Sequence, residues 1–572
     1  MKTLQGIPAA QGIGIGTVVC VREPRLDWSG VRFAGEENER RRLAQALELF
    51  CSQTHALAQT ARARVGAGEA GILEGQAAMA RDPELLQQAH ALISAGKTAE
   101  AAIAEVCAHY AALFDGLEDE LMRQRAADVR DMRTRLLRQM LGVAPPDLRA
   151  LPAGSVLVAH DLTPSMTIGL RREQVAAILT EVGGRAGHAA ILARAMELPA
   201  VLGVPDLLEQ AADGDTVIVD GSAGVALLHP DGALLEEYRT RKREEQLRRE
   251  KLAVWRVRPT RDADGRPFSL CANIGSVKEA VGAVQAGADG VGLFRTEFLF
   301  LDRAAPPAEE EQLEVYRQAA ECMAGKELII RTLDVGGDKP AKALHMPREE
   351  NPFLSCRAIR YCLRHPELFC TQLRAILRAG AKARNVKLML PMVTGVEEVR
   401  AARELIARCR AQLAAEGLAF DENMPVGVMI ETPAAAFTAD ILAQEADFFS
   451  IGTNDLTQYM LAVDRGDAEV ERLYTPFQPA VLRQLRFVIQ TAKKAGIPVG
   501  LCGEAAADPR MIPLLLAFGL DEFSVGVTAV PAVRARIAGW TKEQAEKIAR
   551  GAMACATAEE AEAYLGAACE ER

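Results

Sequence analysis

The chain has 572 residues, of which 49% are hydrophobic and 25% charged, a composition typical of a globular protein in water. Its length exceeds what one hydrophobic core supports and predicts three or four domains. A net charge of −10 argues against nucleic-acid binding, and the sequence has no apolar run long enough for membrane insertion. The first residues lack a signal-peptide pattern, and the 12 cysteines are scattered without metal-site spacing, so we expect a cytoplasmic protein.

The composition of the first part of the chain, and with it the predicted secondary structure, changes twice. Residues 1–21 contain alternating glycines followed by Val-Val, which predicts a turn and a strand. Residues 22–144 are rich in Ala, Leu, Glu and Arg and predict four or five helices, whereas residues 145–230 return to alternating strands and helices. Because the early strand needs partners, we expect 1–21 and 145–230 to form one discontinuous α/β domain, with 22–144 inserted as a helical bundle.

A glycine turn in this α/β domain carries a single histidine. Residues 183–194 read Gly-Gly-Arg-Ala-Gly-His-Ala-Ala-Ile-Leu-Ala-Arg, between a predicted buried strand and a predicted helix. His188 therefore lies at the start of a helix, where free backbone N–H groups and the helix dipole favour an anion. Taken alone, the pattern also fits an ordinary histidine at a polar turn.

The second half of the chain begins after a charged segment. Residues 231–255 mix acids and bases and predict a solvent-exposed linker helix. Residues 256–572 then alternate strand-like and helical segments, as successive βα units do. Eight parallel strands predict a (β/α)8 barrel, whose active site lies at the C-terminal ends of the strands. The predicted strands are Phe268–Asn273, Gly290–Phe294, Leu328–Leu333, Lys387–Met392, Val426–Ile430, Phe448–Ile451, Pro498–Leu501 and Glu522–Val525.

Charged and polar residues follow the ends of several predicted strands. Arginines bind planar or tetrahedral oxyanions through fork-shaped hydrogen bonding, and Glu431 and Asp455 are hard oxygen ligands suited to Mg²⁺ held together with a phosphate. The long excursion 335–384 is placed to form a wall or lid over the barrel mouth. The set predicts a small ligand with several negative charges, including a phosphate. Its members are Arg295, Arg331, Asp334, Lys339, Arg357, Glu431, Gly452, Thr453, Asn454, Asp455, Arg465, Cys502 and Glu504.

Taken together, these motifs resemble the enzyme I family of the bacterial sugar phosphotransferase system over essentially the whole chain. The matching segments are Gly-Gly-Arg-x-x-His188, Phe-Arg295-Thr-Glu, Arg331-Thr-Leu-Asp-Val-Gly-Gly-Asp-Lys339, Gly-Thr-Asn454-Asp455-Leu-Thr-Gln-Tyr and Leu-Cys502-Gly-Glu. The resemblance implies a multidomain α/β protein: a swivelling phosphohistidine α/β domain with an inserted α-helical bundle, a linker helix and a C-terminal TIM barrel. It implies that phosphoenolpyruvate, bound with Mg²⁺, phosphorylates His188, which then phosphorylates a histidine of the phosphocarrier protein HPr as the first step of sugar uptake.

The resemblance also assigns roles to residues. It implies that Cys502 protonates the methylene carbon of the departing enolate, that Glu431 and Asp455 hold Mg²⁺, and that Thr167 orients His188. It implies substrate binding by Arg295, Arg331, Asn454, Arg465, Arg357, Lys339, Thr453 and Gly452. It implies a homodimer through the barrel, 256–572, and an HPr-binding surface on the helical insertion at Glu74, Gln76, Met79, Arg125 and Asp128.

The chain departs from the family at its centre. The family usually has Thr-Ser-His-Thr where this chain has Ala186-Gly187-His188-Ala189, so three hydroxyl groups are missing. One such hydrogen bond contributes roughly 0.5–1.5 kcal/mol, so we expect slower phosphorylation and not its loss.

Two other functions remain open. A pyruvate phosphate dikinase or phosphoenolpyruvate synthase would need a nucleotide-binding domain, and residues 1–145 contain no glycine-rich phosphate loop for one. A phosphoenolpyruvate-binding regulator that has lost transfer would fit the altered histidine segment, but it would have no need of Cys502 as a proton donor.

Overall fold

The computed structural model describes residues 1–22, 26–64, 67–116, 120–145, 148, 151–163, 166, 170–184, 187–301, 303, 305–336, 342–344, 346, 351–467 and 469–570. Arg185, Ala186, Thr167 and Lys339 fall outside these residues. The chain divides into two compact units, Met1–Leu247 and Arg248–Arg572. Across the described helices, none is both long enough and apolar enough to cross a membrane.

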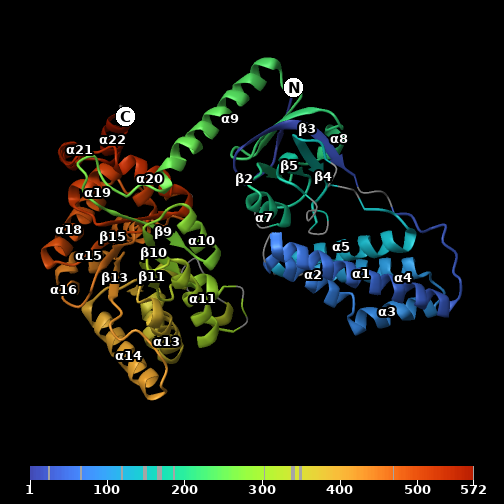
Figure 1. The fold of residues 1–572 in the computed structure, drawn as a ribbon, viewed down its shortest axis with the longest axis horizontal. Helices are drawn as coiled ribbons and strands as arrows, with labels where there is room; N and C mark the ends of the chain where they lie inside the picture. The colour runs from blue at the N-terminus through green and yellow to red at the C-terminus, as the bar shows by residue number, and fades with distance from the viewer. Residues whose placement is uncertain are drawn as a thin grey trace. The chain divides into compact units, whose positions relative to one another are not determined.

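The first unit contains an eight-stranded sheet in the order β1-β8-β7-β3-β4-β5-β6-β2 (Figure 1). Strand β3 is parallel to β4 on one side and antiparallel to β7 on the other, so the early strand does pair with strands that follow the helical region. Glycine is needed in β3, because a Cβ at Gly16 would lie 2.0 Å from the carbonyl oxygen of Gly154. The strands are β1 Lys2–Gln5, β2 Ile7–Ala10, β3 Ile13–Val21, β4 Ser155–Ala159, β5 Val175–Thr180, β6 Ala200–Leu202, β7 Thr216–Asp220 and β8 Val225–Leu228.

The helical region between β3 and β4 forms α1 to α5, at the upper end of the predicted number. Side chains from these helices bury a common core that includes Leu43, Phe50, Ile103 and Met132. The breaks follow the sequence: the Asp82 carboxylate, for example, accepts hydrogen bonds from the first backbone N–H groups of α3. The helices are α1 Glu36–Arg64, α2 Ala67–Met79, α3 Pro83–Ser94, α4 Ala99–Asp115 and α5 Glu120–Leu141, followed in the α/β part by α7 His188–Ala195 and α8 Leu207–Gln210.

The charged segment is helical, as predicted, in α9, Gly232–Ala253, and the division between the two units falls within this helix. Beyond it, the second unit contains a closed barrel of eight parallel strands (Figure 1). The predicted barrel is therefore confirmed, and its strand ends lie within two residues of the predicted ones. The strands are β9 Ser269–Ile274, β10 Gly290–Arg295, β11 Leu328–Arg331, β12 Val386–Leu390, β13 Val426–Ile430, β14 Phe449–Ile451, β15 Val499–Leu501 and β16 Glu522–Gly526.

Helices surround these strands, and their apolar faces share one extensive core with them. The fourth strand ends at Leu390, two residues before the predicted end, because Met392 has a left-handed φ of 57° that breaks the extended backbone. The helices are α10 Val277–Gln285, α11 Glu309–Cys322, α12 Ala358–Arg364, α13 Pro366–Ala383, α14 Val396–Ala415, α15 Pro433–Phe437, α16 Ala439–Leu442, α17 Thr453–Leu461, α18 Pro479–Ala495, α19 Ile512–Phe518, α20 Val530–Ile537, α21 Lys542–Ala554 and α22 Ala558–Glu570.

Candidate active site

A cavity of about 400 Å³ opens at the C-terminal ends of the barrel strands. It brings together most of the predicted site residues that the structure describes, from strands or loops far apart in the sequence. Such a volume suits a small molecule, and the charges along the wall suit an anionic one. The polar lining consists of Arg295, Arg331, Asp334, Arg357, Glu431, Asn454, Asp455, Arg465, Glu471, Tyr474, Cys502 and Glu504, and Gly452 also lines the cavity.

Two arginines of this cavity are held by a buried carboxylate between them. Asp334 is 3.0 Å from Nη1 of Arg331 and accepts a hydrogen bond of 2.9 Å from Nη2 of Arg357. Glu297, which is fully buried, accepts a further bond of 2.7 Å from Arg331. Burial disfavours both charged guanidinium groups, but these carboxylates outweigh it and raise the pKa of Arg331 and of Arg357. Both arginines are therefore charged and fixed in orientation before any ligand binds.

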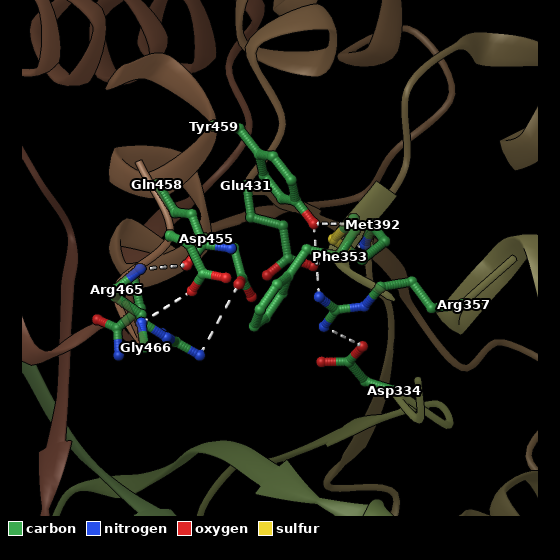
Figure 2. Close-up of polar contacts among 12 residues, drawn as sticks. Asp334, Phe353, Arg357, Met392, Glu431, Asp455, Gln458, Tyr459, Arg465 and Gly466 are labelled. Atoms are coloured by element: carbon green, nitrogen blue, oxygen red, sulfur yellow. Dashed lines mark hydrogen bonds and ion pairs between the residues drawn. The ribbon is translucent and has the colours of Figure 1, made fainter. Parts of the chain in front are cut away.

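Glu431 and Asp455 form the acidic part of the wall. Figure 2 shows Arg357 and Arg465 approaching these two carboxylates from opposite sides. Burial first, and then the nearby charges of Asp455 and Asp334, raise the pKa of Glu431 to about 8. Carboxylates crowded in this way gain from a cation placed between them.

The same two carboxylates fit a hard divalent cation. Asp455 Oδ1 is buried without a hydrogen-bond partner among the described residues. A Cβ at Gly452 would lie 2.8 Å from Glu431 Oε2, so only glycine leaves this oxygen clear. Within the described ranges, no three His, Cys, Asp or Glu residues form a complete metal cluster. Two carboxylates without further protein ligands are typical of Mg²⁺ that is shared with a substrate phosphate.

The segment after β14 supplies the rest of the anion-binding wall. Helix α17 begins at Thr453, directly beside the cavity, so its first backbone N–H groups are available to an anion. The side-chain oxygen of Asn454 accepts a hydrogen bond of 3.0 Å from the backbone N–H of Glu504. The backbone carbonyl of Asn454 accepts one of 3.1 Å from the Tyr474 hydroxyl. Arg465 lies 4.0 Å from Asp455 and is about one third exposed.

Cys502 lies at the end of β15 with its thiol inside the barrel, among Leu293, Met389 and Met429. Only 3% of the residue is exposed. Burial is the main cause that raises the pKa of this thiol to about 11, and the thiol donates a hydrogen bond of 3.7 Å to the backbone carbonyl of Ile451. The thiol is therefore protonated at neutral pH, as a proton donor must be.

The histidine turn is built differently. His188 is the first residue of α7, after an N-cap at Gly187 that makes no side-chain capping bond. The imidazole is about one quarter exposed, and its Nε2 lies 3.9 Å from Oδ1 of Asp128, on helix α5 of the bundle. Asp161 is also near: burial raises the pKa of this carboxyl, and the charge of His188 lowers it in part.

The five predicted partner-binding residues do not share one exposed surface in this structure. Glu74 is exposed and Met79 half-buried, but Gln76 is fully buried and Asp128 is only 4% exposed. Gln76 donates a hydrogen bond of 3.2 Å to Asp131 and accepts one of 3.2 Å from Arg135, while Arg125 donates one of 3.3 Å to Asp128. A polar network inside the bundle thus holds Gln76, which the helical periodicity did not distinguish from a surface residue.

Thr453 differs from its neighbours in the predicted substrate set. Thr453 lines a second cavity beside the first, whereas Gly452 lines the first and Asn454 lines both. In the sequence, Glu297 was noted only as the last residue of the Phe-Arg295-Thr-Glu motif, and Tyr474 was not singled out. Both support the site. A usable signal existed for Glu297, because a buried arginine such as Arg331 requires a carboxylate partner.

The chain is similar to known proteins over most of its length. Three family models match: "PEP-utilising enzyme, N-terminal" over residues 5–125, "PEP-utilising enzyme, mobile domain" over 151–224 and "PEP-utilising enzyme, PEP-binding domain" over 249–541. The phosphoenolpyruvate-protein phosphotransferase of Geobacillus stearothermophilus is 40% identical over 99% of this chain and 98% of its own length. The protein of the same name from Staphylococcus carnosus is 38% identical over 98% of each chain. The chain belongs to the phosphoenolpyruvate-protein phosphotransferase family.

Proposed function

We propose that this chain transfers the phosphoryl group of phosphoenolpyruvate to His188 and then to a histidine of the phosphocarrier protein HPr, releasing pyruvate as the first step of sugar uptake. The observation that carries the proposal is the barrel-mouth cavity, in which oriented arginines face a carboxylate pair beside a buried, protonated thiol. This combination suits a small phosphate ester that must be protonated on carbon after it loses its phosphoryl group.

In this proposal the substrate is bound by charge and by backbone. Arg295, Arg331 and Arg465 bind the carboxylate and phosphate oxygens, and Arg357 and Lys339 add positive charge. The start of α17, with Gly452, Thr453 and Asn454, presents backbone N–H groups to the phosphate. Glu431 and Asp455 would hold Mg²⁺, which would neutralise phosphate charge as transfer begins.

The proposed reaction has two steps, the transfer of the phosphoryl group to His188 and the protonation of the enolate that remains. An imidazole nitrogen of His188 forms a bond to phosphorus while the bond from phosphorus to the enol oxygen breaks, which leaves the enolate of pyruvate. The Cys502 thiol gives its proton to the methylene carbon of this enolate, so that pyruvate leaves as the ketone, and the thiolate later recovers a proton from water. Because the pKa of Cys502 is raised to about 11, the donor stays loaded over the whole physiological pH range.

The division of labour along the chain follows the same proposal. Residues 1–21 and 145–230 carry the histidine, 22–144 bind HPr, 231–255 link the two halves, and 256–572 bind the substrate and form a homodimer. Glu74, Met79 and Arg125 are the members of the predicted HPr surface that have exposed or half-exposed side chains. Gln76 and Asp128 join that surface only if the bundle shifts, and Thr167 orients the imidazole.

Incubation with [³²P]phosphoenolpyruvate and Mg²⁺ tests the proposal directly. We expect an acid-labile, base-stable label on the wild-type chain, none on His188→Ala, and transfer of the label to purified HPr. Label that survives His188→Ala would contradict the assignment. Substrate binding without any labelling or pyruvate release would favour the alternative of a regulator that has lost transfer, and ATP-dependent synthesis of phosphoenolpyruvate would favour a synthase.

A further inference from the structure

The hydroxyl group of Tyr459 joins two parts of the barrel mouth that lie far apart in the sequence. Tyr459 belongs to α17, whereas Phe353 and Arg357 belong to the segment 351–357, which leads into α12. The hydroxyl donates a hydrogen bond to the backbone carbonyl of Phe353 and accepts one of 3.5 Å from Nη1 of Arg357 (Figure 2). A phenolic hydroxyl has one proton to donate and lone pairs that accept, so it forms both bonds at once.

The guanidinium group of Arg357 is held at both of its terminal nitrogen atoms. Nη2 donates a hydrogen bond of 2.9 Å to Asp334, and Nη1 donates the bond to Tyr459. A planar guanidinium held at one nitrogen can still pivot about that contact, whereas contacts at two nitrogens fix the direction of its plane. Arg357 is 2% exposed and lines the substrate cavity, so the direction of its plane decides which N–H groups an anion meets there.

The same hydroxyl also fastens the backbone of the segment 351–357. The carbonyl that it binds belongs to the short helical turn Pro352–Leu354, and the Phe353 ring centroid lies 6.0 Å from Cζ of Arg357. Within the segment, the backbone N–H groups of Leu354 and Arg357 each donate a hydrogen bond of 3.0 Å. A single turn is not stable by itself, so its order depends on contacts with other parts of the protein.

Tyr459 acts on the substrate cavity through these partners. Asp455, one helical turn earlier on α17, lines the cavity, whereas Tyr459 is not one of the described lining residues. Burial raises the pKa of the Tyr459 hydroxyl, and the charge of Arg357 lowers it in part. The hydroxyl therefore keeps its proton at neutral pH and remains a donor to the carbonyl of Phe353.

We propose that Tyr459 is the positioning residue that holds the segment 351–357, and with it the guanidinium group of Arg357, in place at the barrel mouth. The consequence for the substrate rests on the proposed function, in which Arg357 adds positive charge for phosphoenolpyruvate. Without the hydroxyl, Arg357 keeps Asp334 but loses its second contact, and the turn loses its bond to α17. The free protein then populates states in which the segment has moved, and the substrate has to restore the bound arrangement at a cost in affinity.

Hydrogen exchange on the full chain, without any ligand, tests the fastening of the segment. In Tyr459→Phe, which keeps the ring, we expect the backbone N–H groups of Leu354 and Arg357 to exchange about two- to tenfold faster, the worth of one hydrogen bond. Unchanged exchange in the barrel strands would show that the variant is folded. Tyr564→Phe is the matched control, because this partly buried tyrosine of α22 packs against α21 and should leave exchange at 351–357 unchanged.

Calorimetry with phosphoenolpyruvate and Mg²⁺ on His188→Ala, in which no transfer to the histidine follows, tests the effect on the substrate. Adding Tyr459→Phe should raise the Kd by about two- to tenfold, whereas adding Tyr564→Phe should leave it unchanged. In a chain that already carries Arg357→Gln, Tyr459→Phe should change the Kd by less than about twofold, because no guanidinium is left to orient.

The kinetics of the chain with His188 intact provide a further readout. In turnover with HPr, Tyr459→Phe should raise the KM for phosphoenolpyruvate and lower kcat by less than about twofold, because saturating substrate restores the bound arrangement of the segment. A general loss of folded protein would lower kcat and leave KM unchanged.

Unchanged exchange at Leu354 and Arg357 in Tyr459→Phe would overturn the proposal. An equal rise in Kd with and without Arg357→Gln would also overturn it, because the hydroxyl would then act independently of this arginine. A chain whose exchange responds as expected but which does not bind phosphoenolpyruvate would overturn the proposed function and leave the fastening of the segment in place.

Discussion

The side chains of the barrel mouth and of the histidine turn differ in burial and in their distances to charged partners. At the barrel mouth, Arg331 and Arg357 are almost fully buried and fixed by Asp334 at 3.0 and 2.9 Å. At the turn, His188 is partly exposed, its sequence neighbours are Gly187 and Ala189, and its Nε2 lies 3.9 Å from Oδ1 of Asp128.

The difference follows from what each site would have to do. A site that stabilises developing charge gains from groups whose orientation is set before the reaction, because no reorganisation is then needed. A phosphoryl carrier has to meet two partners in turn, so bulky or tightly bonded neighbours would obstruct it. The small residues Gly187 and Ala189 beside His188 would leave clearance for both partners.

The largest expected effect is that of removing the buried proton donor. In Cys502→Ser the hydroxyl is a much weaker acid, so pyruvate release should fall by about 10²- to 10⁴-fold while phosphoenolpyruvate still binds. Pyruvate formation coupled to lactate dehydrogenase measures the rate, and calorimetry measures the affinity. Cys555→Ser, at a half-exposed cysteine at the end of α21, is the matched control and should keep full activity. A Cys502→Ser rate within tenfold of the wild type would exclude this thiol as the donor.

The fixed arginine pair is tested by Asp334→Asn. This change leaves two buried guanidinium groups with one carboxylate fewer, so the free energy of unfolding should fall by about 3–5 kcal/mol. Urea unfolding of the full chain, followed by tryptophan fluorescence, measures it. The control is Glu416→Gln, which breaks a pair with Arg374 at 2.6 Å whose carboxylate is about half exposed, and it should cost less than about 1 kcal/mol. An equal fall in the free energy of unfolding for the two variants would mean that the buried ion pairs of the barrel mouth contribute no more than a surface pair.

The opposite end of the barrel should affect stability without affecting chemistry. Burial, and then the charge of Glu327, raises the pKa of Glu522 from 4.5 to about 8. The folded state then holds a proton that the unfolded state releases, so this contribution is complete below pH 4.5 and is lost as the pH rises through 8. Over this window the wild type should lose several kcal/mol relative to Glu522→Gln, on the order of 1.4 kcal/mol for each unit of pKa difference.

Urea unfolding of both proteins at pH 5 and pH 8.5 provides the measurement. Parallel stability curves for wild type and Glu522→Gln would contradict the raised pKa. The rate of phosphoenolpyruvate turnover at pH 7 should be the same in the two proteins, since Glu522 lies at the start of β16, away from the barrel mouth.

The smallest expected effect concerns the histidine turn itself. Gly187 is the N-cap of α7 and has extended backbone angles, φ −72° and ψ 164°, that serine also adopts as a cap. Gly187→Ser restores one of the missing hydroxyl groups and should speed phosphorylation of His188 by about two- to tenfold, the worth of one hydrogen bond. Rapid-quench measurement of phosphohistidine formation detects this change.

Gly187→Ala is the matched control, because its Cβ makes the same contact, 3.3 Å from the carbonyl oxygen of Gly184, without a hydroxyl. An equal gain in the alanine variant would assign the effect to helix formation and not to hydrogen bonding. No gain in the serine variant would mean that the turn does not need the orientation that its relatives have.

The sequence by itself determined the barrel, the sheet that β3 joins, and most of the residues at the barrel mouth. It could do so because strand periodicity is local and because parallel strands of a barrel end at one face, which brings motifs such as Phe-Arg295-Thr-Glu and Leu-Cys502-Gly-Glu together without any knowledge of their contacts. The charged helix, α9, was equally visible in its composition.

The tertiary structure decided which side chains meet. The burial of Gln76 depends on Asp131 and Arg135 of another helix, and the orientation of Arg357 depends on Asp334. The second cavity exists only because α22 lies against the segment 471–478. Hydrogen bonds and cavities arise between side chains that are far apart in the sequence, and local periodicity carries no information about such distances.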